Sequence, residues 1–347
     1  AYNTAVGSQA GNQITTGGEN TLIGALAGDA LTDADSNVAV GNGSLTNDTL
    51  GSSAVAIGHN ALNTQNFTSA TNSYNVAMGR NAGFSVTTGV QNTLIGGLAG
   101  DALTTGSGLT AVGFSSLSAN TTGGNNTAVG QYSLTANTTG YQIVSIGDES
   151  LAASTTGASN VAVGYRALKD NTTASNNTAV GHSALLSNTT GASNVALGSQ
   201  ALDANTTASN NTSIGYQSLT TNTTGDSNTA VGQSALSTNS TGSSNTAIGR
   251  QALIANTTAS ENTAVGYQSL YANTTGDGNT AIGVKAMDAN TVGDRNVAVG
   301  ADALGSLNPD SNADTYNTAI GYNAGGAVTT GSLNTLIGGL AGDALTD

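Results

Sequence analysis

Residues 157–190 read G-A-S-N-V-A-V-G-Y-R-A-L-K-D-N-T-T-A-S-N-N-T-A-V-G-H-S-A-L-L-S-N-T-T, and residues 191–224 repeat this stretch with few changes. Each copy holds two pentapeptides of the N-T-A-V-G type, whose last residue we call the marker glycine. Twenty marker glycines run from Gly7 to Gly338 at a 17-residue spacing, which two 21-residue steps interrupt. Fixed spacing of this kind is typical of a solenoid, in which every coil presents the same side chains to its neighbours.

Positions within a coil are numbered here from its marker glycine, and several of them keep one chemistry throughout. Position −1 is always Val, Ile, Leu or Met, position −3 is Thr or Val, position −2 is mostly Ala, and position +3 is Ala or Ser. The β-branched pentapeptide predicts a short strand that the glycine closes in a tight corner. A second short strand is expected from position +3 onward. We therefore predict an all-β β-solenoid of about twenty 17-residue coils, forming one continuous array over residues 1–347.

Position +4 indicates how the core is filled. It is Leu or Met in fourteen coils and Gly in the other six, and those six coils carry a large aliphatic residue at position +7 instead. One bulky group per coil is kept although its position changes, as close packing requires. We predict that the row at position −1 and the leucines at +4 form the core, with the marker glycines as corners. In the best-repeated region these residues are Val163, Val180, Leu168, Leu185, Gly164 and Gly181.

Three similar blocks organise the array, with openings near residues 1, 74 and 316. The two 21-residue steps precede the second and third openings, and their extra residues, 65–74 and 308–316, are expected to form loops. Because the chain begins at one block opening and stops inside another block, we expect it to be a fragment of a longer polypeptide.

A 17-residue coil encloses little volume, and its first strand is apolar or small on both faces. One face can fill the interior, and the other is best explained by another copy of the chain. We predict a parallel, in-register homo-oligomer packed through the small side chains at positions −2 and +3. The residues of this expected interface include Ala162, Ala179, Ala167, Ala184 and Ala201.

The N-T-A-V-G-x-x-A-L pattern, with its N-V-A-V-G and N-T-A-I-G variants, resembles the head repeats of trimeric autotransporter adhesins. Similar repeats occur in phage tail-fibre shafts and in large bacterial surface fibre proteins. The resemblance covers the whole chain and implies a left-handed parallel β-roll that is usually trimeric. The 17-residue period is longer than that of the adhesin repeat, and the chain shows no neck, coiled-coil stalk or membrane-anchor segment.

Composition narrows the classes of function. Charged residues make up 7% of the chain, the net charge is −14, and cysteine is absent. So few basic residues argue against binding to nucleic acid or to anionic membranes. Without cysteine there are no disulfides or thiolate metal sites. His59 and His182 both follow a marker glycine, at a variable position, and no nucleophile elbow is present, so we predict no enzymatic activity.

Two sets of residues have the 1-3-5 spacing of a calcium loop: Asp33, Asp35 and Asn37, and Asp310, Asn312 and Asp314. Neither set has Gly at loop position 6 or an acidic residue at position 12. Turn formation explains both sets equally well, so no cofactor is predicted and calcium stays an open alternative. Nine N-T-T or N-S-T triplets match the N-glycosylation sequon, and repetition alone accounts for them.

These observations predict the structural shaft of an extracellular attachment fibre at a cell or virion surface, either a bacterial surface filament or adhesin or a phage tail fibre. One alternative is a glycan-binding module that uses Tyr165, Tyr216, Tyr267 and Tyr322, each directly after a marker glycine. Others are an ice-binding solenoid and a β-helical depolymerase. The depolymerase needs paired carboxylates, which no fixed position of the coil supplies.

Overall fold

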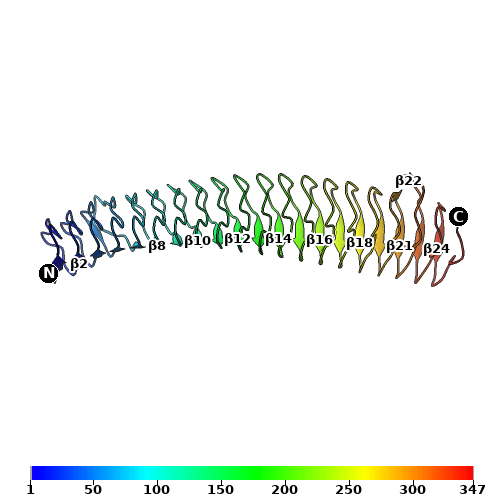
Figure 1. Cartoon of the computed structure of the whole chain (residues 1–347), viewed down its shortest axis with the longest axis horizontal. Coiled ribbons are helices and arrows are strands. Elements are labelled where there is room, and N and C mark those ends of the chain that lie inside the picture. The colour runs from blue at the N-terminus through cyan, green and yellow to red at the C-terminus, as the bar shows by residue number, and fades with distance from the viewer. Residues whose placement is uncertain (1, 347) are drawn as a thin grey trace. The chain divides into compact units, whose positions relative to one another are not determined.

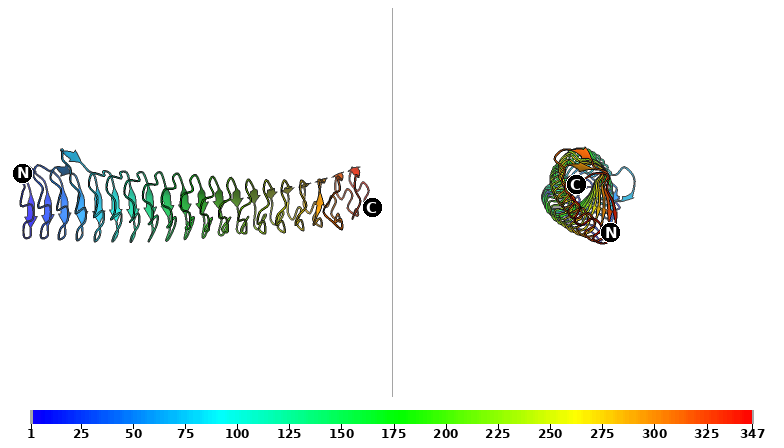
Figure 2. Two further views of the ribbon diagram at one scale, coloured as in Figure 1. Left: turned by 90° about the horizontal axis from the view of Figure 1, so that it is seen from above. Right: turned by 90° about the vertical axis from the view of Figure 1, so that its right-hand side faces the viewer.

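A computed structural model describes residues 2–346 and divides the chain into two compact units, Ala1–Ser175 and Asn176–Asp347. Each unit is a parallel β-solenoid, and together they carry about twenty 17-residue coils, so the predicted fold class is confirmed. Strands of successive coils lie side by side within each unit (Figures 1 and 2). No helix is present among the described residues.

Every coil contributes one three-residue strand, at positions −3 to −1. In the first unit these strands are β1 (Thr4–Val6), β2 (Thr21–Ile23), β3 (Val38–Val40), β5 (Val55–Ile57), β7 (Val76–Met78), β8 (Thr93–Ile95), β9 (Thr110–Val112), β10 (Thr127–Val129), β11 (Val144–Ile146) and β12 (Val161–Val163). In the second unit they are β13 (Thr178–Val180), β14 (Val195–Leu197), β15 (Thr212–Ile214), β16 (Thr229–Val231), β17 (Thr246–Ile248), β18 (Thr263–Val265), β19 (Thr280–Ile282), β21 (Val297–Val299), β23 (Thr318–Ile320) and β24 (Thr335–Ile337).

The expected second strand of each coil is absent from the described residues, and this prediction was wrong. In most coils the segment from position +1 to +6 consists of turns. Positions +2 and +4 both adopt positive φ, as in Arg166 (56°) and Leu168 (52°), and so does position −5, as in Ser159 (56°). A residue with this left-handed conformation cannot continue an extended strand.

Both insertions are tied back to the solenoid by a short parallel pairing. In the first, β6 (Thr71–Asn72) pairs with β4 (Gly51–Ser52) of an earlier coil. In the second, β22 (Ala313–Asp314) pairs with β20 (Gly293–Asp294). The ladder of main strands continues across each insertion, since Val55 pairs with Val76 and Val297 with Thr318. The extra residues therefore bulge outward without interrupting the stack.

The interior is built from positions −2, +3 and +4. Leu168 and Leu185 are fully buried, and so, outside the two terminal coils, are the alanines at positions −2 and +3, including Ala162, Ala179 and Ala167. Position −1 points outward: Val163 is partly exposed and the exposed fraction of Val180 is 37%. The predicted core row at −1 and the predicted interface alanines were thus assigned to the wrong faces, because a residue buried inside its own coil cannot contact another chain.

Steric competition between positions −2 and +4 explains why small residues lie inside. Where position −2 is Leu, as in Leu22 and Leu94, the coil carrying it and the preceding coil both have Gly at position +4. A Cβ on Gly11 would lie 2.8 Å from the Leu22 side chain, and one on Gly28 2.9 Å from it. A single leucine at −2 therefore takes the space of two leucines at +4. Elsewhere only Ala or Ser fits beside the +4 leucine.

The exchange between positions +4 and +7 is also visible in three dimensions. A Cβ on Gly28 would lie 2.8 Å from the side chain of Leu31, which is fully buried at position +7. Val86, Leu103 and Val328 are likewise fully buried. The moved aliphatic side chain therefore reaches the volume that a +4 leucine fills in other coils.

The marker glycine sets the closest approach between coils. Gly130 has φ 132°, and a Cβ there would lie 2.5 Å from the carbonyl oxygen of Gly147 in the next coil. We expect Gly130→Ala to lower the local free energy of opening by about 2 kcal/mol or more, because backbone strain and overlap with main-chain atoms add together. Hydrogen exchange of the neighbouring amides measures this opening.

Gly97→Ala is the matched control. Gly97 lies in the same unit, has no positive φ, and its Cβ would meet only the Phe114 ring at 3.5 Å. Equal exchange in the two variants would contradict the assigned role of the marker glycine.

Candidate functional site

Two internal ladders of asparagine connect successive coils. At position −4, each Oδ1 accepts the N–H of the corresponding residue in the next coil, as in Asn211 N to Asn194 Oδ1 (2.9 Å). Its Nδ2 donates to a backbone carbonyl further along the chain, as in Asn211 to Gly225 (2.9 Å). Both atoms of the buried amide are thereby satisfied, as a polar group away from water requires.

The second ladder occupies position +7 and runs from amide to amide. Asn137 donates to Asn120 Oδ1 (2.6 Å), and Asn222 donates to Asn205 Oδ1 (3.2 Å) and to the Gly225 carbonyl (2.9 Å). Asn occupies −4 in seventeen of the twenty coils, which is a sequence signal for a ladder at that position, where the principal partner of each amide is backbone. The sequence did not reveal the ladder at +7, although frequent Asn at a position shared with buried Leu was a signal.

These ladders give the glycosylation sequons a structural role. The asparagines of the N-T-T and N-S-T triplets are fully buried members of the +7 ladder. They are Asn120, Asn137, Asn171, Asn188, Asn205, Asn222, Asn239, Asn256 and Asn273. A glycan cannot be attached to these amides in the folded coil.

The structure does not assemble the first calcium candidate. Asn37 is buried in the −4 ladder, where its Oδ1 accepts the N–H of Ala54 at 2.9 Å. Asp33 accepts from Thr16, and Asp35 accepts the N–H of Gly18 at 2.7 Å. The three oxygens that the spacing grouped together are thus occupied in separate interactions.

In the second calcium candidate, Asp314 accepts from Arg295 and from the Tyr316 hydroxyl (2.9 Å), while Asp310 and Asn312 are exposed. Burial and the nearby carboxylates of Asp277 and Asp314 raise the pKa of Asp294. Among residues 2–346, no group of three or more His, Cys, Asp or Glu side chains is placed to hold a metal ion.

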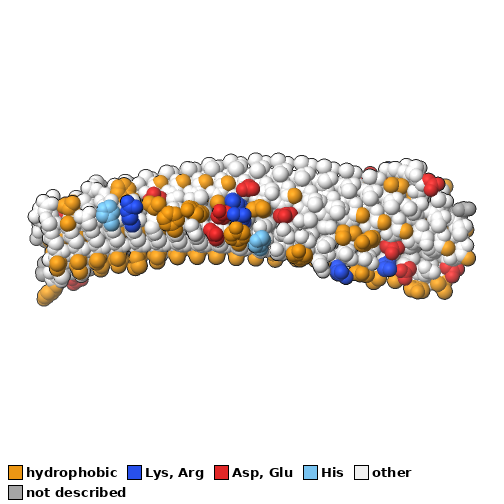
Figure 3. Space-filling model, in the orientation of Figure 1, with side chains coloured by type: hydrophobic (Ala, Val, Ile, Leu, Met, Phe, Trp, Pro, Cys, Tyr) orange, Lys and Arg blue, Asp and Glu red, His pale blue; other side chains and the backbone are white. Residues whose placement is uncertain are grey.

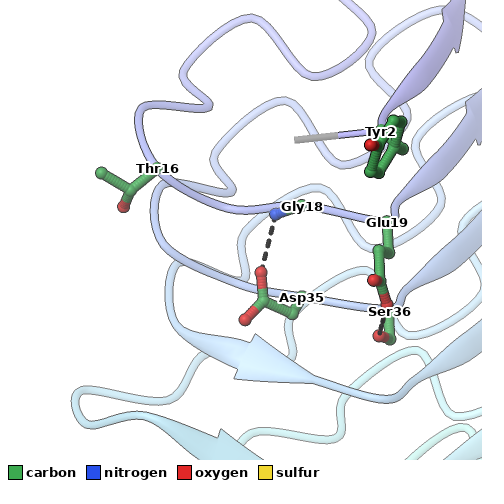
Figure 4. Close-up of a pocket in the computed structure, with 6 residues that line it drawn as sticks. All are labelled: Tyr2, Thr16, Gly18, Glu19, Asp35 and Ser36. Carbon is green, nitrogen blue, oxygen red and sulfur yellow. Dashed lines mark hydrogen bonds between the residues drawn. The ribbon is translucent and has the colours of Figure 1, made fainter.

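Two shallow hollows lie at the same place in the repeat, over positions −6 and −5. The one in the first unit, about 390 Å³, is lined by Tyr2, Thr16, Gly18, Glu19, Asp35 and Ser36 (Figure 4). Its counterpart in the second unit is lined by Ser260, Glu261, Asp277, Gly278 and Arg295. Ligand pockets are usually lined mainly by apolar side chains. These hollows are corrugations between neighbouring coils, lined largely by polar groups.

Asp29 and Asp101, each in a G-D-A-L stretch, are half-buried turn residues. Burial raises the pKa of Asp29 and of Asp101, and one carboxylate oxygen of each is buried without a hydrogen bond. Ionising such a carboxylate costs stability, because charge loses hydration there without gaining a partner.

The outward face of the strands carries the most extended apolar surface, and we call it the −1 row. It contains the Val, Ile, Leu and Met side chains at position −1, flanked by partly exposed Thr or Val at −3. Ile23, Met78, Ile248 and Ile282 each expose about 40% of their surface. Figure 3 shows hydrophobic side chains following one edge of the first unit. Neither position carries a charge in any coil.

The tyrosines singled out from the sequence are all exposed, between 39% for Tyr267 and 62% for Tyr322. Two of them are covered by arginine: the guanidinium of Arg166 lies 4.8 Å from the Tyr165 ring centre, and that of Arg250 lies 5.7 Å from Tyr267. His59 and His182 are also exposed. The sequence did not indicate Phe114 and Tyr132, which stacking brings into edge-to-face contact at 5.7 Å.

No family model and no curated protein matches the chain. Within residues 2–346 there is also no helix long and apolar enough to cross a membrane.

The −4 ladder predicts a pH-dependent variant. Asn211→Asp replaces a buried donor that faces the Gly225 carbonyl with a carboxylate, and burial raises the folded-state pKa of that carboxylate above its unfolded value near 3.9. Below the unfolded pKa the acid is neutral and its O–H can donate to Gly225. Stability is then lost as pH rises through the folded pKa. We expect faster local hydrogen exchange at pH 8 than at pH 4, after correction for intrinsic rates.

Asn210→Asp is the control, since Asn210 is exposed one residue away. A similar pH dependence in both variants would show that the buried amide is not needed.

Proposed function

We propose that the chain is a non-enzymatic structural shaft of an extracellular attachment fibre, as in a bacterial surface filament or adhesin or a phage tail fibre. The observation that carries the proposal is the uniformity of the coils. Successive coils of a unit are bonded through the same backbone interactions and, in most coils, through Asn at −4. Ten of the twenty coils also carry Asn at +7. A coil that repeats with the same interactions serves to set length, because each added coil extends the stack by the same rung.

The surface composition supports the same role. About half of the exposed residues are Asn, Thr, Ser or Gln, and the whole chain has only six Lys and Arg residues. A surface with so few basic residues offers few sites to trypsin-like proteases, which suits a protein outside the cell. Parallel pairing of each strand with the next within a unit also leaves few unpaired strand edges.

The shaft is proposed to be a parallel homo-oligomer joined through the −1 row, in place of the alanines expected from the sequence. A partner must match an apolar position on every coil at the rung spacing of about 4.8 Å. A second copy of the chain, parallel and in register, satisfies this condition at each rung. Burying one methylene per coil contributes about 0.8 kcal/mol, or about 8 kcal/mol over ten coils before the entropy cost of association. The adhesin resemblance suggests three chains.

The shaft role predicts that length is modular. Deleting residues 191–224 removes two coils of the second unit without changing the repeat phase. We expect the variant to fold, and the maximum dimension measured by small-angle scattering to shorten by about 10 Å, twice the rung spacing. A second copy of the segment should lengthen it equally. Loss of folding on removal of these two coils would contradict a modular spacer.

The interface is tested by charging the −1 row. Ile214→Glu, Ile248→Glu and Ile282→Glu together place three carboxylates per chain on already exposed positions, where the lone chain tolerates them. We expect the native protein to sediment as an oligomer and this variant as a monomer, because buried like charges repel and lose hydration. The triple variant Thr224→Glu, Thr241→Glu and Thr258→Glu, on another exposed face, should still assemble. A monomeric native chain would overturn the self-association.

A further inference from the structure

Charged and aromatic side chains are scarce in this chain, yet several gather on four adjacent coils of the first unit. Phe114 is at position +1, Tyr132, Glu149 and Arg166 occupy position +2 of three successive coils, and Lys169 is at +5. We call these five residues the aromatic–charged strip. Figure 3 shows charged side chains beside hydrophobic ones on this face.

Backbone hydrogen bonds hold the strip in order. The backbone N–H of Tyr132 donates to the carbonyl of Phe114 in the preceding coil (3.0 Å). The N–H groups of Glu149 and Arg166 likewise donate to backbone carbonyls of their preceding coils, at the same distance. The Phe114 and Tyr132 rings meet at 84°, and they expose 47% and 39% of their surfaces. The apolar end of the strip is therefore open and fixed in place.

The charged end is also ordered. Glu149 Oε2 accepts from Arg166 Nε (2.7 Å) and from Lys169 Nζ (2.8 Å), and these two bonds lower the pKa of Glu149. Both cations pair with the same carboxylate oxygen, Oε2. The other oxygen, Oε1, has lone pairs that can accept a ligand hydroxyl. Side chains fixed before binding lose little entropy when a ligand arrives.

We propose that the aromatic–charged strip binds a short neutral oligosaccharide. A sugar ring has an apolar C–H face that can lie on Phe114 or Tyr132, and a rim of hydroxyls that can bond to the Glu149 carboxylate and to the remaining donors of Arg166. The proposal uses positions outside the −1 row and does not depend on the shaft function.

Charge and size select this ligand. Both cations of the strip are already paired with Glu149, and the net charge of the chain is −14, which disfavours a polyanion. Four rungs of about 4.8 Å and a width of two residues, roughly 7 Å, give on the order of 130 Å². A stable protein interface needs about 800 Å² from each partner. The strip is the size of a few sugar rings.

The test measures binding of the full chain to immobilised neutral hexasaccharides (cellohexaose, laminarihexaose, maltohexaose, mannohexaose and chitohexaose), with a heparin hexasaccharide as the anionic arm. We expect at least one neutral probe to bind. The double variant Phe114→Gln and Tyr132→Gln should lose at least tenfold in affinity, and Glu149→Gln at least threefold. Glutamine already occupies positions +1 and +2 in other coils, as in Gln233 and Gln217, so these variants are expected to fold.

Tyr322→Ala, an exposed tyrosine in the second unit, is the control and should bind within twofold of the native chain. The proposal is overturned if no neutral probe binds, if only heparin binds, or if the double variant binds as well as the native chain. The scattering and sedimentation experiments on the shaft are read independently of these results.

Discussion

Contact between marker glycines is the constraint on which the rest of the coil depends. A Cβ at nearly every marker position would lie within 2.7 Å of main-chain atoms of the following marker glycine, so the coils approach as closely as bare backbone allows. That approach brings three left-handed residues of each coil into hydrogen bonds with neighbouring coils. The backbone N–H groups of Ser159 and Arg166 donate to carbonyls of the preceding coil, and that of Leu151 donates to a carbonyl of the following coil. Each such conformation costs about 1 kcal/mol or more in isolation. The N–H groups of these residues bond to adjacent coils. Turn bonds within the coil, such as Ala167 N–H to the Gly164 carbonyl (3.2 Å), add to them, so each coil keeps its shape partly through its neighbours.

The thinness of the coil explains why so much of its interior is amide. With Ala at −2 and +3 and one leucine at +4, apolar side chains fill only the middle of the section. At the corners the backbone turns inward, and its N–H and C=O groups need partners there. Asparagine supplies one acceptor and two donors from a short side chain, which matches the two or three bonds that each corner requires. The asparagine side chain is uncharged. A ladder of asparagines can therefore extend over many coils without the repulsion that a ladder of aspartates would introduce.

The period, the corners and the exchange of leucine between +4 and +7 could all be predicted from the sequence, because each is a direct consequence of stacking identical coils. The inward face of the strand was not predicted, because alternation alone does not distinguish the two faces when both are apolar. The sequence does hold a signal that decides between them. Leu22, Leu94 and Leu336 at −2 occur only in coils with glycine at +4. The two serines at −2, Ser145 and Ser213, occur with Ser150 and Ser218 at +3, and each pair is hydrogen bonded inside (2.5 and 2.6 Å). Residues that change together share a volume, which places −2 in the interior.

Sites on this surface were harder to predict, because they arise between coils. Phe114 and Tyr132 belong to adjacent coils and stand at different positions of the repeat, so no linear motif joins them. Since the interior positions tolerate few residue types, variation is confined to the corners and turns that face outward. Each variable position recurs at every rung, so neighbouring choices add to form strips along the stack rather than enclosed pockets. A surface of this kind favours ligands that are themselves linear and repetitive, such as another copy of the chain on the −1 row or an oligosaccharide on the aromatic–charged strip.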